Sequence, residues 1–253
     1  MGQTERLQIM RDWLKTTPEL SLEQLMDRFT VSRDTARRDL IRMEEEGDVI
    51  RVKNGAIRSR VNLTARYEDR IVSEDKLWAA REAAKLVQAN ERILFDASTT
   101  VAAMIQFLPN VPITAVTNSL DIAEQLGQRE EVELYVTGGK FDPHHRSLYG
   151  LRTAEDILDY QVDKVFIGAC GLTGEGLFAE NLEEAVVKKA MVRSAGEVVV
   201  LAAEEKFSRR FLHRVCPLGK IDRLITKHVP KSFEALIAET ETSLLRDDEK
   251  PPA

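Results

Sequence analysis

The stretch VSRDTARRDLIRMEEEGDVIRVKNGA, residues 31–56, decides the fold of the first part of this chain. Ser32 is a good N-cap for a helix expected to run to about Glu46, where Gly47 is a typical stop. The segment after it reads as two short strands around Lys53-Asn54-Gly55, and Asn-Gly is a strong hairpin signal. The stretch therefore predicts one helix followed by a β-hairpin.

Two more helices are predicted before this stretch. Apolar residues recur at helical spacing from Leu7 to Leu14, so the first helix is expected to end near Thr17–Pro18. Ser21 and Gln24 have the spacing of a capping box, and an apolar helical face follows them. Three helices and a hairpin within residues 1–60 predict a winged helix-turn-helix DNA-binding domain.

The third predicted helix has the residue types of a DNA-recognition helix. Ala36, Leu40 and Met43 share one face and are expected to point into the domain core. Arg33 and Arg37 then share another face, and arginine can donate two hydrogen bonds to a guanine. This helix is therefore predicted to read base edges in the major groove.

The hairpin is expected to act as a wing that offers basic side chains, including Arg58, to phosphates. The alternative is that the helix arginines form a solvated face, on which Arg38 only pairs with Asp34 four residues earlier. The residues predicted to contact DNA are Ser32, Arg33, Thr35, Arg37, Arg38, Arg51, Lys53 and Asn54.

Residues 31–56 resemble the N-terminal signature of the DeoR-type bacterial repressors. That signature reads V-S-x-x-T-x-R-R-D-L-x-x-L-E-x-x-G and ends in a wing with G-G-A or N-G-A. Met43 stands here where the usual residue is leucine. The resemblance implies a winged helix-turn-helix in which Thr35, Arg37 and Arg38 contact DNA.

Composition describes an ordinary globular chain with an uneven charge distribution. Of 253 residues, 43% are hydrophobic and 31% charged, and the formal net charge is −6. Residues 1–60 hold 12 Lys and Arg against 11 Asp and Glu, whereas the remainder holds 24 against 31. A nearly neutral small domain on an acidic body fits binding through a few placed arginines better than broad electrostatic coating of nucleic acid.

Several classes of protein and site are disfavoured. No apolar run is long enough for a membrane span, the first residues lack the core of a signal peptide, and two cysteines make no disulfide framework. A cytoplasmic location is therefore expected. The four histidines have no metal-ligand spacing, so neither a metal nor a cofactor is expected.

The rest of the chain alternates between helical and apolar strand patterns. After an expected linker at residues 61–75, six candidate strands are RILFDA, ITAVTN, VELYVTG, KVFIGAC, EVVVLAA and RLITK. Helical stretches, such as KLWAAREAAKLV and NLEEAVVKKAMVRSA, lie between most of them. This alternation predicts an α/β domain at residues 76–245 with a mostly parallel sheet, followed by a disordered tail at 246–253.

Polar and glycine-rich residues follow several of these strands. Because ligands bind at the carboxyl ends of strands in open parallel sheets, these residues are candidates for an effector site. Ser98, Thr99 and Thr100 would start a helix that offers amides to a phosphate, and Lys206 would supply a cation. The alternatives are that Ser98 only caps a helix, that Gly138-Gly139 only turns the chain and that Lys206 is solvated.

Residues 96–100, DASTT, resemble the D-x-[GS]-[ST]-T loop of the DeoR-type sensor domain, and TNS, TGG, NLEEAVVKKAM and EEKF resemble further parts of it. The resemblance implies a fold similar to ribose-5-phosphate isomerase and CoA-transferase-like proteins. It also implies that a phosphorylated sugar or related metabolite controls operator affinity. The predicted effector-binding residues are Asp96, Ser98, Thr99, Thr100, Asn118, Gly138, Gly139, Glu183 and Lys206.

Two local features depart from that pattern or add to it. Glu204 and Glu205 precede Lys206 where family members often read D-x-S-K or D-S-S-K, and acids there favour a less anionic effector or contacts to hydroxyls. The segment HHRSLYG could bring Arg146 or the histidines to a ligand, but an exposed polar loop is the simpler interpretation.

The sequence therefore predicts a repressor of a sugar or carbohydrate catabolic operon. Its expected partners are double-stranded operator DNA, a phosphorylated sugar or related effector, and further copies of itself in a dimer or tetramer, because two half-sites are usually read by symmetric protomers. An activator with the same architecture stays open. The alternative from another class is a sugar-phosphate isomerase or CoA-transferase-like enzyme, with Glu183, Glu184 or Glu204 as candidate catalytic groups.

Overall fold

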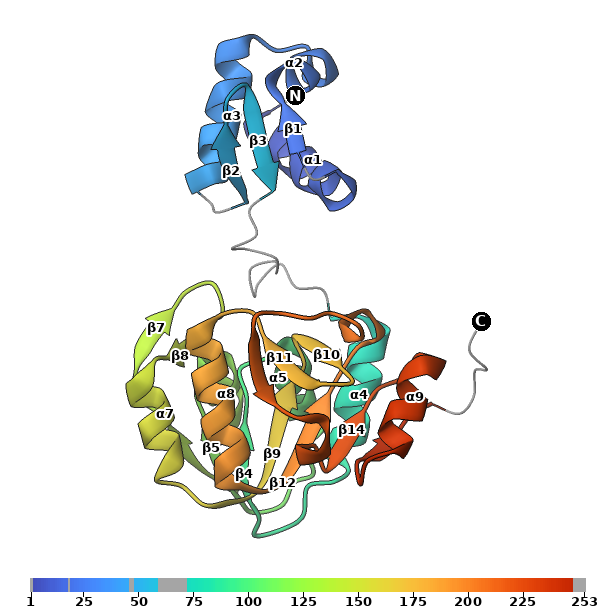
Figure 1. The fold of residues 1–253 in the computed structure, drawn as a ribbon. Helices are drawn as coiled ribbons and strands as arrows, with labels where there is room; N and C mark the ends of the chain where they lie inside the picture. The colour runs from blue at the N-terminus through green and yellow to red at the C-terminus, as the bar shows by residue number, and fades with distance from the viewer. Residues whose placement is uncertain (1, 18, 46–47, 59–71, 248–253) are drawn as a thin grey trace. The chain divides into compact units, whose positions relative to one another are not determined.

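The computed structural model describes residues 2–17, 19–45, 48–58 and 72–247. The chain divides into two compact units, residues 1–65 and 66–253 (Figure 1). The predicted linker falls mostly outside the described residues, although its last residues enter helix α4, which begins at Glu74. Most of the predicted tail also lies outside them.

The N-terminal unit contains the three predicted helices and the predicted hairpin, together with one additional strand. Its elements are α1 (Gln3–Thr16), β1 (Glu19–Ser21), α2 (Leu22–Phe29), α3 (Arg33–Glu45), β2 (Val49–Val52) and β3 (Gly55–Arg58). The capping box of α2 is present, with Ser21 and Gln24 bonded to each other's backbone amides. This confirms the predicted winged helix-turn-helix.

The three helices enclose one small core. Ala36, Leu40 and Met43 on α3 are buried in it, as their spacing predicts. A buried ion pair joins α1 to α3, because Arg6 Nε donates to Asp39 Oδ2 over 2.7 Å. The opposite face of α3 is thereby held toward solvent.

The wing is a three-stranded sheet in the order β1-β3-β2. Its two-residue loop is Lys53-Asn54, and Asn54 adopts a φ of 68°. Gly55 is the first residue of β3 and passes so close to β1 that a Cβ there would lie 2.3 Å from the carbonyl oxygen of Leu20. The glycine of the Asn-Gly pair is therefore required by the added strand.

The second unit is built on a seven-stranded sheet in the order β15-β14-β12-β9-β4-β5-β6, in which every pairing is parallel. All six predicted strands are present. The strands are β4 (Arg92–Phe95), β5 (Ile113–Thr117), β6 (Val132–Val136), β9 (Val162–Gly168), β12 (Ala195–Leu201), β14 (Arg223–Ile225) and β15 (Ser243–Leu245).

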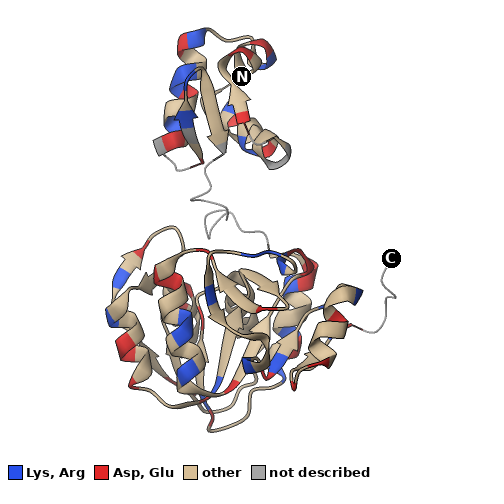
Figure 2. Cartoon of the chain, viewed as in Figure 1, with Lys and Arg blue, Asp and Glu red and all other residues tan. Residues whose placement is uncertain are grey.

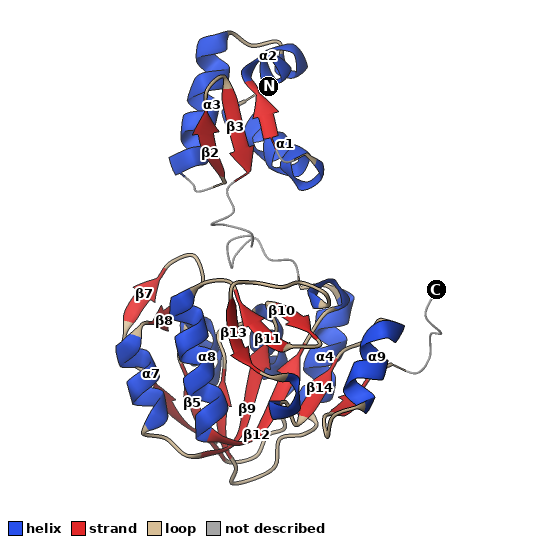
Figure 3. Cartoon of the chain, viewed as in Figure 1, coloured by secondary structure: helices blue, strands red, loops and turns tan. Residues whose placement is uncertain are grey.

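Helices cover both faces of this sheet (Figure 3). One face carries α4 (Glu74–Ala84), α5 (Thr99–Met104) and α6 (Leu120–Leu126), whose apolar residues share a core with Ile93 and Phe95. The other carries α7 (Leu151–Leu158), α8 (Leu182–Ser194) and α9 (Lys231–Ala238), which share a core with Leu94 and Val165. Alternate residues of β4 thus face opposite cores, which confirms the predicted α/β class.

Short strands that the sequence pattern did not predict form two further sheets. The β7 (Lys140–Asp142) and β8 (Ser147–Tyr149) strands form a hairpin between β6 and α7. The β10 (Gly171–Thr173), β11 (Gly176–Ala179) and β13 (His213–Cys216) strands form a small antiparallel sheet after β9. Both follow the carboxyl ends of strands in the main sheet.

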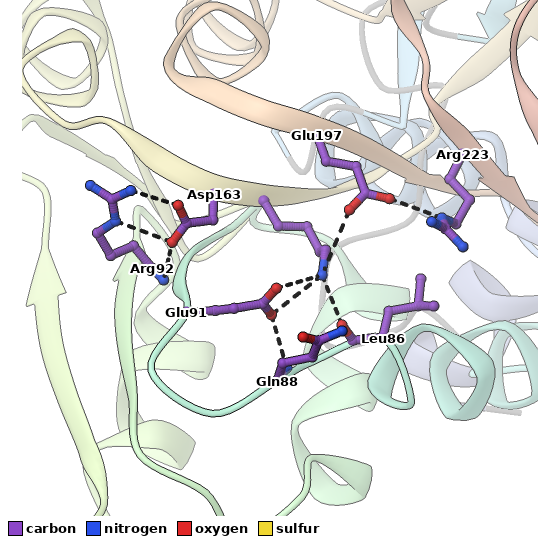
Figure 4. Close-up of polar contacts among 8 residues, drawn as sticks. Leu86, Gln88, Glu91, Arg92, Asp163, Glu197 and Arg223 are labelled. Atoms are coloured by element: carbon purple, nitrogen blue, oxygen red, sulfur yellow. Dashed lines mark hydrogen bonds and ion pairs between the residues drawn. The ribbon is translucent and has the colours of Figure 1, made fainter.

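The amino ends of the strands are joined by ion pairs (Figure 4). Lys164 is buried, and its Nζ lies 2.8 Å from Leu86 O, 3.0 Å from Glu91 Oε1 and 3.7 Å from Glu197 Oε2. Arg223 Nε lies 2.9 Å from Glu197 Oε1 on the neighbouring strand. Since these charges are paired with one another, their role at this edge of the sheet is structural.

Candidate functional site

The start of α3 is organised by Ser32. The Ser32 hydroxyl accepts a hydrogen bond from Thr35 N at 3.3 Å and lies 3.0 Å from the Thr35 hydroxyl. Ser32 therefore caps the helix, and both hydroxyls sit at the end of α3 that a recognition helix directs at base edges.

Basic residues recur along α3 (Figure 2), and Arg33, Arg37 and Arg38 are exposed. Arg33 Nη2 donates to Asn54 Oδ1 at 3.1 Å, which links the helix to the tip of the wing. Arg38 pairs with Asp34 at 3.1 Å, which is the surface ion pair that the sequence allowed as an alternative to DNA contact. Arg37 is exposed and has no ion pair among the described residues. Arg33 and Arg37 thus lie on the exposed side of α3, and their contact with bases stays a prediction.

The wing contributes fewer available cations than its composition suggests. Arg51 is held by Glu44, with Nε at 2.5 Å from Oε2 and its backbone amide at 3.0 Å from Oε1. Lys53 is exposed in the hairpin loop. The side chain of Arg58 lies outside the described part of the chain.

In the second unit, the strand order reverses between β4 and β9, which lie side by side in the middle of the sheet. Ligands in open α/β sheets bind outside the carboxyl ends of strands at such a point. Asp96, which follows β4, is fully buried there. Its Oδ2 accepts from Gly168 N at 3.0 Å, whereas its Oδ1 has no hydrogen-bond partner among the described residues.

A buried lysine lies against this carboxylate. Lys188 Nζ on α8 lies 2.7 Å from Gly168 O, 3.1 Å from Asp96 Oδ2 and 3.2 Å from Glu184 Oε1. The Cys170 thiol donates to Glu184 Oε1 at 2.9 Å. Asp96, Cys170, Glu184 and Lys188 therefore form one buried polar cluster, here called the switch-point cluster.

Burial and charge act against each other on the ionisation of this cluster. Burial opposes the charge on Lys188, but the carboxylate of Asp96 leads the interactions that raise the pKa of Lys188 well above its ordinary value. Burial would raise the pKa of Glu184, but Lys188 and the Cys170 thiol bring it below its ordinary value. Burial, and next the charge of Glu184, raises the pKa of Cys170 to about 12. The lysine is therefore charged and the cysteine is a neutral thiol at physiological pH.

Three predicted residues adjoin the cluster on α5. The Ser98 hydroxyl accepts from Val101 N at 3.1 Å, so it caps this helix of six residues. A Cβ on Gly168 would lie 2.1 Å from Ser98 Oγ, which shows how closely β9 approaches. Thr99 and Thr100 are buried in the first turn.

Other predicted residues lie at the ends of β5 and β6. Asn118 is buried, and its Nδ2 donates to Leu148 O at 3.0 Å while its Oδ1 has no partner among the described residues. Gly138 N donates to Asp156 Oδ2 at 3.0 Å. Gly139 has a φ of 137°, and a Cβ there would lie 1.9 Å from Thr153 Oγ1. The glycine pair therefore has a clear structural task in turning the chain.

Two predicted residues lie apart from the switch-point cluster. Glu183 is exposed and pairs with Lys140 at 3.5 Å, whereas the next residue, Glu184, points inward. Lys206 ends the 3-10 turn Glu204–Lys206, and its Nζ lies 3.7 Å from Glu205 Oε1. An effector role for Glu183 or Lys206 stays a prediction, without the close contact to Asp96 that Lys188 makes.

Sequence reasoning missed Lys188, Cys170 and the inward position of Glu184. The signal was present, because Glu184 and Lys188 are four residues apart on a helix whose neighbouring residues are apolar. The expectation of an exposed polar loop at HHRSLYG was wrong, because Ser147–Tyr149 form β8 and both Ser147 and Tyr149 are buried. His145 is buried, since its Nδ1 lies 2.9 Å from Asp142 Oδ2 and its ring packs edge-on against Tyr149.

The described residues contain no cluster of three or more His, Cys, Asp or Glu side chains arranged to hold a metal ion. Within the same part of the chain, no helix combines the length and apolar character that a membrane crossing demands.

Comparisons with known proteins match both units to one family. Residues 6–60 match the DeoR-like helix-turn-helix domain, and residues 72–228 match the DeoR C-terminal sensor domain. The HTH-type transcriptional repressor GlcR of Bacillus subtilis is 39% identical over 91% of this chain and 90% of its own. The glycerol-3-phosphate regulon repressor of Escherichia coli is 26% identical over 91% and 93%.

Among solved structures, ribose 5-phosphate isomerase A from Methanocaldococcus jannaschii covers 52% of this chain and 53% of its own, with 25% identity and a TM-score of 0.38. The family matches, in contrast, extend over both units and almost the whole described chain. They assign DNA binding to the first unit and effector sensing to the second, as in a regulator and not an enzyme. The protein belongs to the DeoR family of helix-turn-helix transcriptional regulators.

Proposed function

We propose that this regulator represses a carbohydrate catabolic operon and is released when a phosphorylated sugar or a related metabolite binds beside the switch-point cluster. The relatives support a carbohydrate regulon, since they include a glycerol-3-phosphate regulon repressor and a putative aga operon transcriptional repressor. For this chain, the nature of the effector follows from the chemistry of the strand ends.

The observation that carries the proposal is a set of buried polar atoms without hydrogen-bond partners among the described residues. Those on and beside the ends of β4, β5 and β6 include Asp96 Oδ1, Asn118 Oδ1, Asp121 Oδ2 and Thr137 Oγ1. Buried polar groups in folded proteins are almost always satisfied, so such a group points to a missing partner. The carboxylate and amide oxygens accept hydrogen bonds, which suits a ligand that carries several hydroxyl groups.

The charges of the site favour the sugar portion of the ligand as the part that enters deepest. The positive charge of Lys188 is already matched by Asp96 and Glu184. A phosphate would therefore be repelled from the cluster and is expected nearer the backbone of residues 98–100 or Lys206. Operator binding is assigned to Arg33 and Arg37 for bases and Lys53 for phosphate, in a symmetric oligomer that reads two half-sites.

The test begins with an operator duplex selected from a random DNA pool at near-physiological salt. Phosphorylated and unphosphorylated sugars are then titrated against the complex by fluorescence anisotropy. Thr137→Val keeps the side-chain shape but removes a hydroxyl that makes no hydrogen bond with the described residues. This variant should bind operator normally and require at least tenfold more effector for release.

Two matched variants sharpen the result. Arg37→Ala should abolish specific operator binding while leaving the affinity for effector unchanged, since Arg37 lies on α3. Thr226→Val removes a hydroxyl that is satisfied by His228 O at 2.8 Å, and it should leave the effector concentration for release unchanged. If no phosphorylated sugar or polyol releases the operator, or if Thr137→Val responds like wild type, the proposed effector site is wrong.

A further inference from the structure

The strand β6 (Val132–Val136) forms one edge of the seven-stranded sheet, and within the described part of the chain it pairs only with β5. Three of its five side chains are exposed, including Tyr135 at 42% and Val136 at 44%, whereas Val132 and Leu134 are half-buried against the core. The strand contains neither proline nor lysine, the residues that commonly block an open edge. An open edge of this kind is a template for a further strand.

The backbone groups available at this edge follow from the pairing with β5. Ile113 N donates to Glu131 O and Thr137 N donates to Thr117 O, so residues 131 and 137 direct these groups toward β5. Backbone direction alternates along a strand, which gives residues 133 and 135 the same orientation. The carbonyls of Val132, Leu134 and Val136, and the amides of Leu134 and Val136, therefore point away from the sheet.

We infer that β6 pairs antiparallel with β6 of a second copy of this chain, around a two-fold axis at Leu134. In this register Leu134 faces Leu134 of the partner subunit and exchanges two hydrogen bonds with it. The Val136 amide of each copy then meets the Val132 carbonyl of the other. Every outward group except the two terminal Val136 carbonyls finds a partner, and the two sheets become one of fourteen strands.

The side chains are complementary in the same register. On the face toward α6, where Leu134 and Val132 already pack on the core, valine meets valine and leucine meets leucine. On the opposite face, Glu133 lies across from Tyr135 of the other copy. Within one copy Tyr135 Oη already donates to Glu133 Oε1 at 2.8 Å, so the same pairing can repeat across the axis. A second copy is thus a better occupant than an unrelated strand.

The inference rests on the proposed self-association and adds the surface through which it occurs. A two-fold axis also matches the symmetry of an operator made of two half-sites. The pairing concerns the sensor domain, which is also where the effector is proposed to bind.

The first experiment is sedimentation of the full chain at micromolar concentration. Val136→Lys places a charge on the edge beside apolar partners and should raise the dimer dissociation constant at least tenfold. Leu212→Lys makes a comparable change at an apolar residue that is 86% exposed elsewhere, and it should leave the dimer intact. Circular dichroism and thermal unfolding verify that both variants are folded.

The second experiment tests the register under mild oxidation on a non-reducing gel. Cα atoms of a hydrogen-bonded antiparallel pair lie about 5.5 Å apart, so Leu134→Cys should form a covalent dimer across the axis. Val136→Cys is the control, because the two copies of that residue would be roughly 13 Å apart along the strands. The native Cys170 and Cys216 thiols have pKa values raised by burial to about 12 and about 11, so they are expected to remain reduced.

The outcomes distinguish the proposed β6 pairing from self-association through any surface. A monomeric wild-type chain would overturn both the β6 pairing and self-association. A wild-type dimer that persists in Val136→Lys, or that is cross-linked through Val136→Cys and not through Leu134→Cys, overturns the β6 pairing and leaves self-association in place.

Discussion

Lys188 shows how a single buried residue can determine the stability of the switch-point cluster. Its ammonium lies between the buried carboxylates of Asp96 and Glu184, and little solvent reaches any of the three. Removing one partner from a buried ion pair is costly because it leaves an uncompensated charge in a medium of low polarity. The lysine is therefore expected to stabilise the carboxyl edge of the sheet.

Replacing this residue should have a large effect with a characteristic pH dependence. Lys188→Met should lower the free energy of unfolding by about 3–5 kcal/mol at neutral pH. In the variant, burial holds the pKa of both carboxyls above its ordinary value, so stability should improve as pH falls and they become neutral. In the wild type, Lys188 holds the pKa of Glu184 below its ordinary value, so protonation of Glu184 in acid removes stabilisation, whereas burial raises the pKa of Asp96 and its protonation acts in the other direction. The stability of the wild type should therefore improve less than that of the variant as pH falls.

Urea unfolding followed by circular dichroism between pH 4 and 8 measures both trends. Lys189→Met is the control, since that neighbouring lysine lies on α8 outside the cluster. Equal stability of Lys188→Met and wild type at neutral pH would contradict the account.

Prediction at this scale depended on whether residue type alone determines a side chain's direction. Ser98 and Asn118 could be placed near the strand ends from the sequence because hydroxyl and amide residues after apolar strands are conspicuous. Glu183 and Glu184 are adjacent and chemically identical, and only the rotation of α8 turns the second one inward. Lys188 was missed because lysine is rarely buried, and its burial depends on carboxylates that approach from β4 and from its own helix.

Among the elements, the long buried strands were predictable and the short ones were not. Strands such as β9 and β12 carry apolar runs that a buried parallel strand requires. The β1 strand has three residues, and its partner β3 lies more than thirty residues later in the chain. No local pattern signals such a pairing, and the same is true of β7, β8, β10, β11 and β13.

The close approach of β1 to β3 makes Gly55 sensitive to substitution. Gly55→Ala would place a methyl group 2.3 Å from Leu20 O, so β1 must move away from the wing. We expect the N-terminal unit to lose about 1–3 kcal/mol, as for other overpacked sites, and operator binding to weaken as the wing shifts.

Differential scanning calorimetry and operator titration measure the two effects. Gly2→Ala is the control in the same unit, since a Cβ there would meet no atom within 4 Å. A Gly55→Ala variant with wild-type stability and operator affinity would show that β1 can move without cost.

At the scale of the whole molecule, regulation requires that the effector site and the DNA-binding unit share a coupling free energy. Such coupling is reciprocal by thermodynamic necessity. If saturating effector weakens operator binding on the order of 10- to 100-fold, then saturating operator must weaken effector binding by the same factor.

Titration calorimetry of effector with and without the selected duplex, combined with operator titrations at both extremes of effector, measures the two factors independently. The Arg37→Ala variant should show equal effector affinity with and without duplex, because it retains the sensor domain and no longer binds the operator. Unequal factors in the wild type would mean that the effector also acts on a species outside this cycle, such as another oligomeric state. The dependence of the difference between the two factors on protein concentration would then report directly on the pairing of sensor domains.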